Sequence, residues 1–167
     1  LDAIDGKITK VKELHIFMNS VDSIARVCQT AGLKEEDVRI VCADTVRNQL
    51  ITTNYSISSV TDPNAKVNFY TKKGFQGCNL FSNNGLIVVV SDAKKEHTLV
   101  DIETSLVQIT GRLRTNDKFQ NIFRHKIYHI YSTSTKVMSD EEFSDFMEHK
   151  KKVGGFLCSD LMSRDTE

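Results

Sequence analysis

Two guanidinium groups near the end of one predicted helix are the residues of this chain best suited to phosphate chemistry. They belong to Arg112 and Arg114, in the run Gln108-Ile-Thr-Gly-Arg-Leu-Arg114. A guanidinium is planar and permanently charged, and one that is held toward another surface commonly stabilises phosphate charge. The run therefore indicates a contact with a phosphate-bearing ligand or partner.

The element that must position these groups is a helix predicted over Thr98 to Leu113. At about 100° per residue, its apolar residues fall on one stripe, spaced three and four apart as in a core-facing helix. The opposite stripe is polar and ends in Arg112. An alternative stays open, in which this stripe is a solvated face whose basic last turn is favoured by the helix dipole. The apolar stripe consists of Leu99, Ile102, Leu106, Ile109 and Leu113, and the polar stripe of Asp101, Ser105, Gln108 and Arg112.

A second informative run, Phe69 to Leu80, is a predicted strand that opens into a loop with glycines at 74 and 77. Glycine permits positive φ and lets the backbone come close to a ligand. By itself this loop is equally compatible with a plain strand-to-helix turn. A related ambiguity holds for Asn19 and Ser20, which follow an earlier strand and are suited both to capping a helix and to contacting a ligand. Gly32 is expected to stop that helix.

Short β-rich runs alternate along the chain with helical stretches, which is typical of an α/β fold with a mostly parallel sheet and helices on both faces. In such a sheet the functional residues gather beyond the carboxyl ends of the strands. A last helix is predicted from Ser139, with Glu142 completing a capping box. It is expected to bury Phe143, Phe146 and Met147. The five predicted strands are Leu14–Met18, Val38–Ala43, Val67–Thr71, Leu86–Ser91 and Lys126–Tyr131.

Size and composition limit the classes of protein. The 167 residues predict one domain over residues 11–158, with residues 1–10 as a linker or domain entry and residues 159–167 as a polar tail. Lys and Arg balance Asp and Glu at 22 each, so any nucleic-acid contact must be local. Four scattered cysteines and the lack of a long apolar run favour a cytoplasmic protein without a membrane span. The start at Leu1 suggests a segment of a longer polypeptide.

The order of these segments resembles the second, C-terminal RecA-like lobe of superfamily 2 helicases and translocases of the DEAD/DEAH type. Thr71, Gly77 and Asn79 match motif V, in which Thr is followed six residues later by Gly-x-Asp. Gln108, Gly111 and Arg112 match motif VI, Gln-x-x-Gly-Arg-x-x-Arg. His15 to Ser20 is similar to motif IV. The resemblance covers about residues 10 to 135.

This resemblance implies a three-layer RecA-like domain that completes the active site of an ATPase. Arg112, with Gln108 and Arg114, would act on the γ-phosphate, as a charged planar donor can in phosphoryl transfer. ATP and Mg²⁺ would be bound mainly by an upstream P-loop lobe of the same polypeptide, so the isolated domain is expected to be inactive and to hold no metal of its own. The residues implied to contact nucleotide are Gly77, Asn79 and Gly111, and those implied to hold DNA or RNA are Asn19, Ser20, Thr71, Lys72 and Gly74.

Two departures from the family pattern bear on these roles. Asn79 stands where the family has Asp, which removes a carboxylate that couples the nucleotide and nucleic-acid sites. Arg114 follows Arg112 by two residues instead of three, and on a continuing helix it would be turned by about 100°. The departures leave two alternatives open: a non-catalytic interaction module that keeps the motor fold, or an unrelated doubly wound domain that binds a small ligand at its strand ends.

Overall fold

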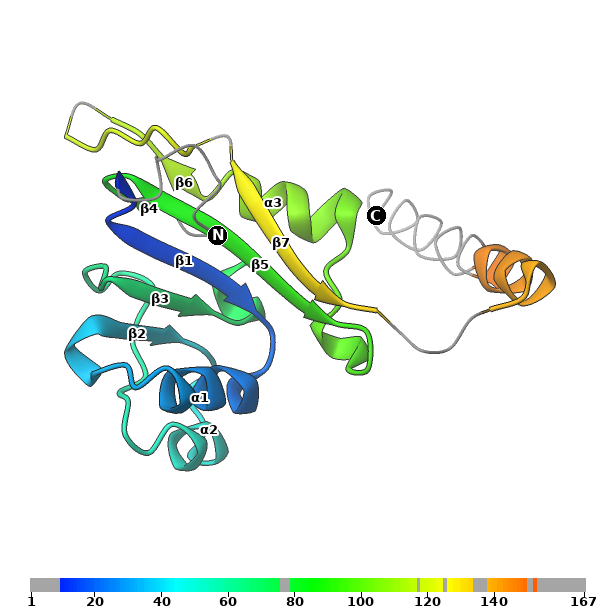
Figure 1. The fold of residues 1–167 in the computed structure, drawn as a ribbon, viewed down its shortest axis with the longest axis horizontal. Helices are drawn as coiled ribbons and strands as arrows, with labels where there is room; N and C mark the ends of the chain where they lie inside the picture. Colours follow the sequence, from blue (N-terminus) through cyan, green and yellow to red (C-terminus); the bar gives the residue numbers. More distant parts are fainter. Residues whose placement is uncertain are drawn as a thin grey trace, which may run out of the picture. The chain divides into compact units, whose positions relative to one another are not determined.

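The computed structural model describes residues 10–75, 79–116, 118–124, 126–133, 138–149 and 152. By its internal contacts the chain divides into two compact units, Leu1–Thr133 and Ser134–Glu167. The first unit contains every labelled strand and helix of Figure 1. The expected boundaries at residues 11 and 158 stay a prediction.

A five-stranded sheet forms the centre of the first unit, and its strands are all parallel, in the order β2-β3-β1-β5-β7 (Figure 1). In the centre of the sheet, Ile16 of β1 lies opposite Phe69 of β3 and Val88 of β5. The predicted α/β fold with a parallel sheet is confirmed, and each predicted strand lies close to an observed one. The strands span Glu13–Met18 (β1), Val38–Val41 (β2), Val67–Tyr70 (β3), Gly85–Asp92 (β5) and Ile127–Ser132 (β7).

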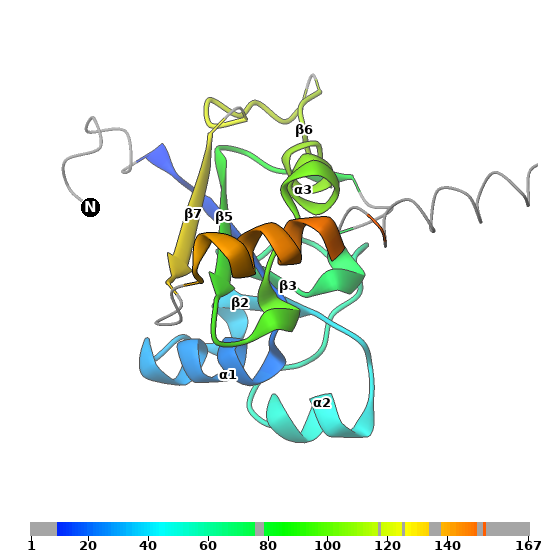
Figure 2. The same cartoon turned by 90° about the vertical axis from the view of Figure 1, so that its right-hand side faces the viewer.

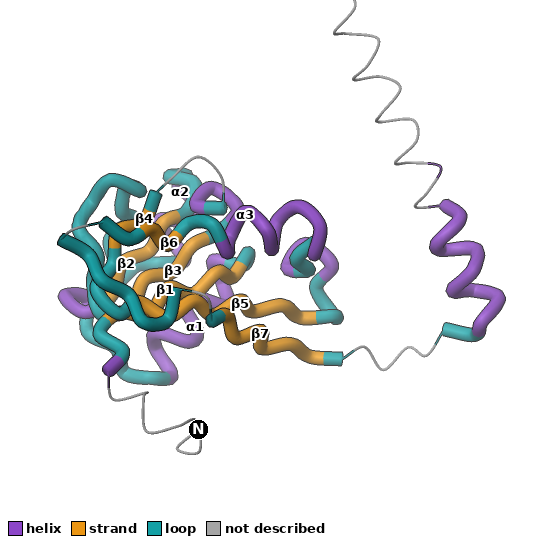
Figure 3. The backbone as a smooth tube through the Cα atoms, turned by 90° about the horizontal axis from the view of Figure 1, so that it is seen from above, coloured by secondary structure: helices purple, strands orange, loops and turns teal. Residues whose placement is uncertain are grey.

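Helices cover both faces of this sheet, as expected. Side chains alternate along a strand, so Phe17 and Met18 of β1 point to opposite faces. Met18 belongs to a buried cluster with Ile24 of helix α1 (Val21–Thr30), whereas Phe17 belongs to a cluster with Ile109 of helix α3 (Val107–Thr110). Figures 2 and 3 show the same elements from the side and from above, including helix α2 (Val46–Ile51) beside α1.

Local hydrogen bonding sets both ends of α1. At its start, the Ser20 hydroxyl accepts a hydrogen bond from the Ser23 amide at 3.3 Å, which satisfies one of the unpaired donors of the first turn. Beyond its end, Gly32 has φ of +60°, a backbone conformation that favours glycine. Both the predicted cap at Ser20 and the predicted stop at Gly32 are confirmed.

The helix predicted from Thr98 to Leu113 is wrong at its start. Asp101 begins the helix instead, because its carboxylate accepts a hydrogen bond from the Thr104 amide at 2.8 Å. A π-helical turn over Ile102–Leu106 follows and leads into α3. Thr98 belongs to a separate 3₁₀ turn, and Leu99, which the stripe placed in the core, is 49% exposed.

The end of this helix also differs from the expectation. Gly111 terminates α3, and strand β6 (Leu113–Arg114) pairs in parallel with strand β4 (Leu80–Phe81). The prediction that Arg114 is rotated by about 100° along a continuing helix therefore does not hold, because no helix continues there. A long-range strand pairing, which helical periodicity does not reveal, decides where Arg114 lies.

A helix over residues 140–149 is described in the second unit. The predicted capping box is confirmed: the Ser139 amide donates to the Glu142 carboxylate at 2.9 Å, and the Glu142 amide donates to the Ser139 hydroxyl at 3.2 Å. The expected burial of its apolar side chains is wrong, because Phe143 is 55% exposed, Phe146 42% and Met147 40%.

A buried polar cluster lies at the amino end of β1. Nδ1 of His15 lies 3.0 Å from the Tyr70 hydroxyl, and Nε2 lies 3.1 Å from the Ser82 hydroxyl. Ser82 donates its proton to Glu13 at 2.6 Å, so its oxygen accepts from Nε2–H and the imidazole suits the neutral form. Burial lowers the pKa of His15, although hydrogen bonding to Glu13 and its charge partly oppose this. A Cβ at Gly85 would lie only 2.8 Å from Nε2, so glycine is required there.

We predict that acid destabilises the domain through His15. Its pKa in the folded state lies below the ordinary value of 6.5. At a pH between these two pKa values, the unfolded chain therefore binds a proton at His15 and the folded chain does not. The stabilisation is complete above pH 6.5 and is lost as the pH falls below it, down to the folded-state pKa. Urea unfolding at several pH values between about 7.5 and 5.5 should show a smaller pH dependence for His15→Gln than for wild type. His97→Gln, at an exposed position, is the matched control. An unchanged pH dependence in His15→Gln would contradict this assignment.

Candidate functional site

A groove of about 360 Å³ lies where the carboxyl ends of β1, β2 and β3 meet. Carboxyl ends of adjacent parallel strands share one edge of a sheet, so segments far apart in the sequence converge there. Asn19, Ser20, Thr71 and Lys72 all line this groove, as the sequence predicted. The groove also contains Lys73 together with two residues that the sequence analysis missed, Arg47 and His97.

Asn19 holds two of the converging loops together. Its amide nitrogen donates to the His97 carbonyl at 2.6 Å, and its oxygen accepts from the Lys72 amide at 3.2 Å. The loops after β3 and β5 are therefore bound to the turn after β1 by one side chain. Asn19 acts here as a positioning residue, and its place at the groove wall is also compatible with contact to a ligand.

Ser20 and Thr71 are mostly enclosed by the protein. Each is 8% exposed, and their hydroxyls bond to the backbone, Ser20 to the amide of Ser23 and Thr71 to the carbonyl of Val41. The long side chains of Arg47, Lys72 and Lys73 are exposed instead, as are those of Asp22 and His97. Thus the accessible surface of the groove carries three permanent cations and one acid among its described residues.

Gly74 has a packing role within the domain. It is buried, and a Cβ at this position would lie 2.8 Å from Cδ1 and 3.0 Å from Cβ of Tyr70. A larger residue would have to displace the strand residue that precedes the loop. The close approach that the sequence assigned to a nucleic-acid phosphate is thus made at least in part to Tyr70.

Arg112 connects the α3 end to the loop that follows β3. Its side chain is half-buried, and Nε donates a hydrogen bond to the Phe75 carbonyl at 2.9 Å. The main chains meet as well, since the Leu80 amide donates to the Arg112 carbonyl at 2.9 Å. Leu80 and Leu113, which are buried in the β4–β6 pair, anchor this junction in the core. The two runs that the sequence singled out are therefore in direct contact.

The remaining predicted residues lie near this junction. Arg114 is exposed on β6, and its Nε donates to the Asn79 side-chain oxygen at 3.4 Å. Gln108 is half-buried on α3, and Gly111 ends that helix. Gly77 lies outside the described residues. The two departures from the family pattern, Asn79 and Arg114, are thus partners of one another.

The carboxyl end of β5 has separate chemistry. The Asp92 carboxylate accepts from the Ser132 hydroxyl at 2.6 Å and from the Lys94 amide at 3.0 Å, and these bonds lower its pKa. The neighbouring Ser91 hydroxyl lies 2.6 Å from Nε2 of His129. These contacts fasten β5 to β7 and lie outside the lining of the groove.

Neither a metal centre nor a membrane span is found in the described part of the chain. No group of three or more His, Cys, Asp or Glu residues there could hold a metal ion. No helix among those residues has the length and apolar character needed to cross a bilayer. Comparison of the chain with protein-family models, curated proteins and solved structures finds no match.

We predict that alanine is tolerated at Gly111 and destabilising at Gly74. At Gly111 the φ angle is −82° and a Cβ would meet only backbone oxygens at 3.7 and 3.8 Å, so Gly111→Ala should change the free energy of unfolding by less than about 1 kcal/mol. Gly74→Ala overlaps Tyr70 and should cost about 1–3 kcal/mol. Urea unfolding of both variants tests this. If both variants lost the same free energy of unfolding, the close approach between Gly74 and Tyr70 would not explain why glycine is needed at position 74.

Proposed function

We propose that this chain is the second motor lobe of an ATP-dependent nucleic-acid helicase or translocase, completed by an upstream P-loop lobe of the same polypeptide. One observation carries the proposal: the three segments that resemble motifs IV, V and VI are bonded to one another. Asn19 bonds to Lys72, and Arg112 bonds to Phe75. A motor lobe requires such contact, because nucleotide and nucleic acid must act on one connected structure.

The nucleotide side of this proposal depends on Arg112. The hydrogen bond from Nε to the Phe75 carbonyl fixes one edge of the guanidinium and so restricts its plane. When the cleft closes on ATP and Mg²⁺ held by the first lobe, Arg112 would stabilise charge on the transferred phosphoryl group, with Gln108 and Arg114 beside it. Gly77, Asn79 and Gly111 would lie near the nucleotide.

The nucleic-acid side depends on the groove. Arg47, Lys72 and Lys73 supply three cations, and the carboxylate of Asp22 is the one acid among the described lining residues. Such a surface attracts the phosphates of a DNA or RNA strand without reading bases. Because the whole chain has no net charge, this local excess of cations is what would direct a strand to this edge.

The loop Lys72–Phe75 would couple the two sides. Its first amide is bonded to Asn19 in the groove, and its last carbonyl is bonded to Arg112. A displacement of either end would be transmitted through four residues that are packed against Tyr70 at Gly74. Coupling through the loop Lys72–Phe75 needs no carboxylate at position 79, where the helicase family has Asp.

We also place the protein in the cytosol. Cys28 and Cys42 are free thiols in the core, as expected in a reducing compartment. Burial raises the pKa of both thiols, that of Cys28 to about 11, so they remain protonated and serve packing.

A second candidate is a non-catalytic interaction module with the motor fold. The hydrogen bond between Arg114 and Asn79 favours it, because this bond engages the second arginine within its own domain. The two candidates differ in whether a longer parent polypeptide hydrolyses ATP.

The first test is ATP hydrolysis by the longer parent polypeptide, with and without single-stranded DNA or RNA. Arg112→Ala should lower stimulated turnover by about 10³-fold or more, the usual contribution of an arginine that acts on the γ-phosphate, and should leave nucleic-acid affinity within about twofold. Arg26→Ala, at an exposed position of α1, is the control and should behave as wild type. Full turnover in Arg112→Ala would refute its role, and no turnover from a folded parent would favour the interaction module.

The second test is the salt dependence of single-strand binding. Replacing both Arg47 and Lys72 by Ala should weaken binding about tenfold or more and reduce the slope of log affinity against log salt by about 1.4, since each phosphate contact contributes about 0.7 on single strands. Lys118→Ala with Lys126→Ala removes the same charge from exposed positions outside the groove lining. Equal losses in the two double variants would show that the groove is not the binding surface.

A further inference from the structure

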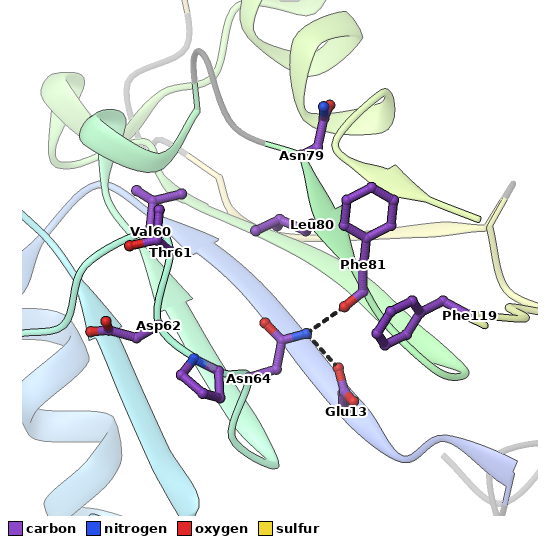
Figure 4. A pocket seen from close by; sticks show the side chains of 10 residues that line it. Glu13, Val60, Thr61, Asp62, Asn64, Asn79, Leu80, Phe81 and Phe119 are labelled. Carbon is purple, nitrogen blue, oxygen red and sulfur yellow. Dashed lines mark hydrogen bonds between the residues drawn. The ribbon is translucent and has the colours of Figure 1, made fainter. Parts of the chain in front are cut away.

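A second hollow, of about 640 Å³, lies beside the amino end of β1 (Figure 4). Glu13 begins this strand and Asn19 follows its end, so the hollow and the cationic groove are separated by about 20 Å of strand. Among the described residues, its lining contains two carboxylates and two aromatic rings but no Lys, Arg or His. The charge of this lining is therefore opposite in sign to that of the groove. The residues that matter are Glu13, Asp62, Asn64, Asn79, Phe81 and Phe119.

The Glu13 carboxylate is held rigidly in the wall of this hollow. Its Oε2 atom accepts hydrogen bonds from Asn64 at 2.9 Å and from Ser82 at 2.6 Å, and lies 3.4 Å from Nε2 of His15. Burial by itself raises the pKa of Glu13, but these hydrogen bonds outweigh it and leave the pKa below its ordinary value. Glu13 is therefore ionised at neutral pH. Among the described residues, none bonds to the second oxygen, Oε1.

Asn64 is itself fixed in place, which makes the wall preorganised. Its side-chain nitrogen also donates to the Phe81 carbonyl at 2.8 Å, as Figure 4 shows, and its oxygen accepts from Arg39 at 2.8 Å. The Arg39 guanidinium is buried and donates as well to the carbonyls of Ser59 and Val60. Arg39 thus holds Asn64 in place and is not among the residues that line the hollow.

Two aromatic rings also line this hollow. The Phe81 and Phe119 ring centroids are 5.8 Å apart with planes inclined at 36°, and Phe81 is 39% exposed. Aromatic faces attract cations, most strongly planar guanidinium groups that can also stack on the ring. Asp62 adds a second negative charge at the same hollow. A guanidinium uses carboxylate oxygens and aromatic faces together as partners, and both kinds of group line this one hollow.

We propose that this hollow binds an organic guanidinium, presented either as an arginine side chain of a protein partner or by a small arginine-like molecule. Its charged end would donate to Oε1 of Glu13, and its plane would lie against Phe81 and Phe119. A phosphate is disfavoured because both ionisable groups among the described lining residues are acids. The acidic and aromatic residues that would bind the guanidinium take no part in the proposed motor function, which shares Asn79 with this lining.

The test is binding of N-acetyl-arginine amide to the full chain by calorimetry or NMR titration, with the citrulline counterpart as an uncharged probe of similar shape. Saturable binding is expected, with citrulline at least tenfold weaker. Glu13→Gln and Phe119→Ala should each weaken binding at least fivefold, whereas Glu103→Gln, an exposed acid elsewhere, should have no effect. Because Glu13 belongs to a buried network, urea unfolding checks each variant, and Asp62→Asn provides a second charge removal that retains an oxygen for the Ser59 amide.

Equal binding of citrulline, or unchanged affinity in both Phe119→Ala and Asp62→Asn, would overturn the proposal. A glycine-flanked peptide with one arginine distinguishes the two sources. Binding of the peptide at least tenfold tighter than the amide supports the arginine of a protein partner, and equal binding supports a free small molecule. These outcomes do not depend on ATP hydrolysis, so this site and the motor function are tested separately.

Discussion

The parallel pairing of β1 with a neighbour on each side is the constraint on which the rest of the molecule depends. β3 lies along one edge of β1 and β5 along the other, both in the same direction. Each of these strands therefore ends at the same side of the sheet, although their last residues are far apart in the sequence. The meeting of Asn19, Lys72 and His97 follows directly from this arrangement. An antiparallel neighbour would have separated them by the length of a strand.

Tyr70 connects the two ends of this arrangement. Its ring stacks on Phe17 with centroids 4.9 Å apart, and its hydroxyl lies 3.0 Å from His15 in the buried polar cluster. Its other neighbour is Gly74, in the loop that joins the groove to Arg112. A single core residue thus supports both the network behind Glu13 and the loop at the carboxyl edge. A substitution at Tyr70 would therefore displace residues both around Glu13 and in the loop after β3, because close-packed interiors transmit displacement.

The contact between α3 and the loop after β3 is secured mainly by the backbone. A single hydrogen bond such as that from Arg112 to Phe75 contributes about 0.5–3 kcal/mol, which by itself would hold a loop weakly. The parallel pairing of β4 with β6 and the burial of Leu80 and Leu113 also hold the two segments together. The hydrogen bond from Arg112 therefore adds to a junction that backbone pairing and core packing support.

Local patterns in the sequence were enough to predict the strands, the α/β class, the Ser20 cap and the Gly32 stop, because these depend on side-chain periodicity and on hydrogen bonds between near neighbours. They also placed Asn19, Ser20, Thr71 and Lys72 at the carboxyl ends of their strands, where all four line the groove. They failed at Thr98 to Leu113, where the Asp101 cap and the pairing of Arg114 with Phe81 override the helical period. Only the tertiary structure could place Arg47 in the groove, or bring Glu13 together with Phe119 at one hollow. Such meetings depend on strand order and long-range packing, which no spacing along the chain encodes.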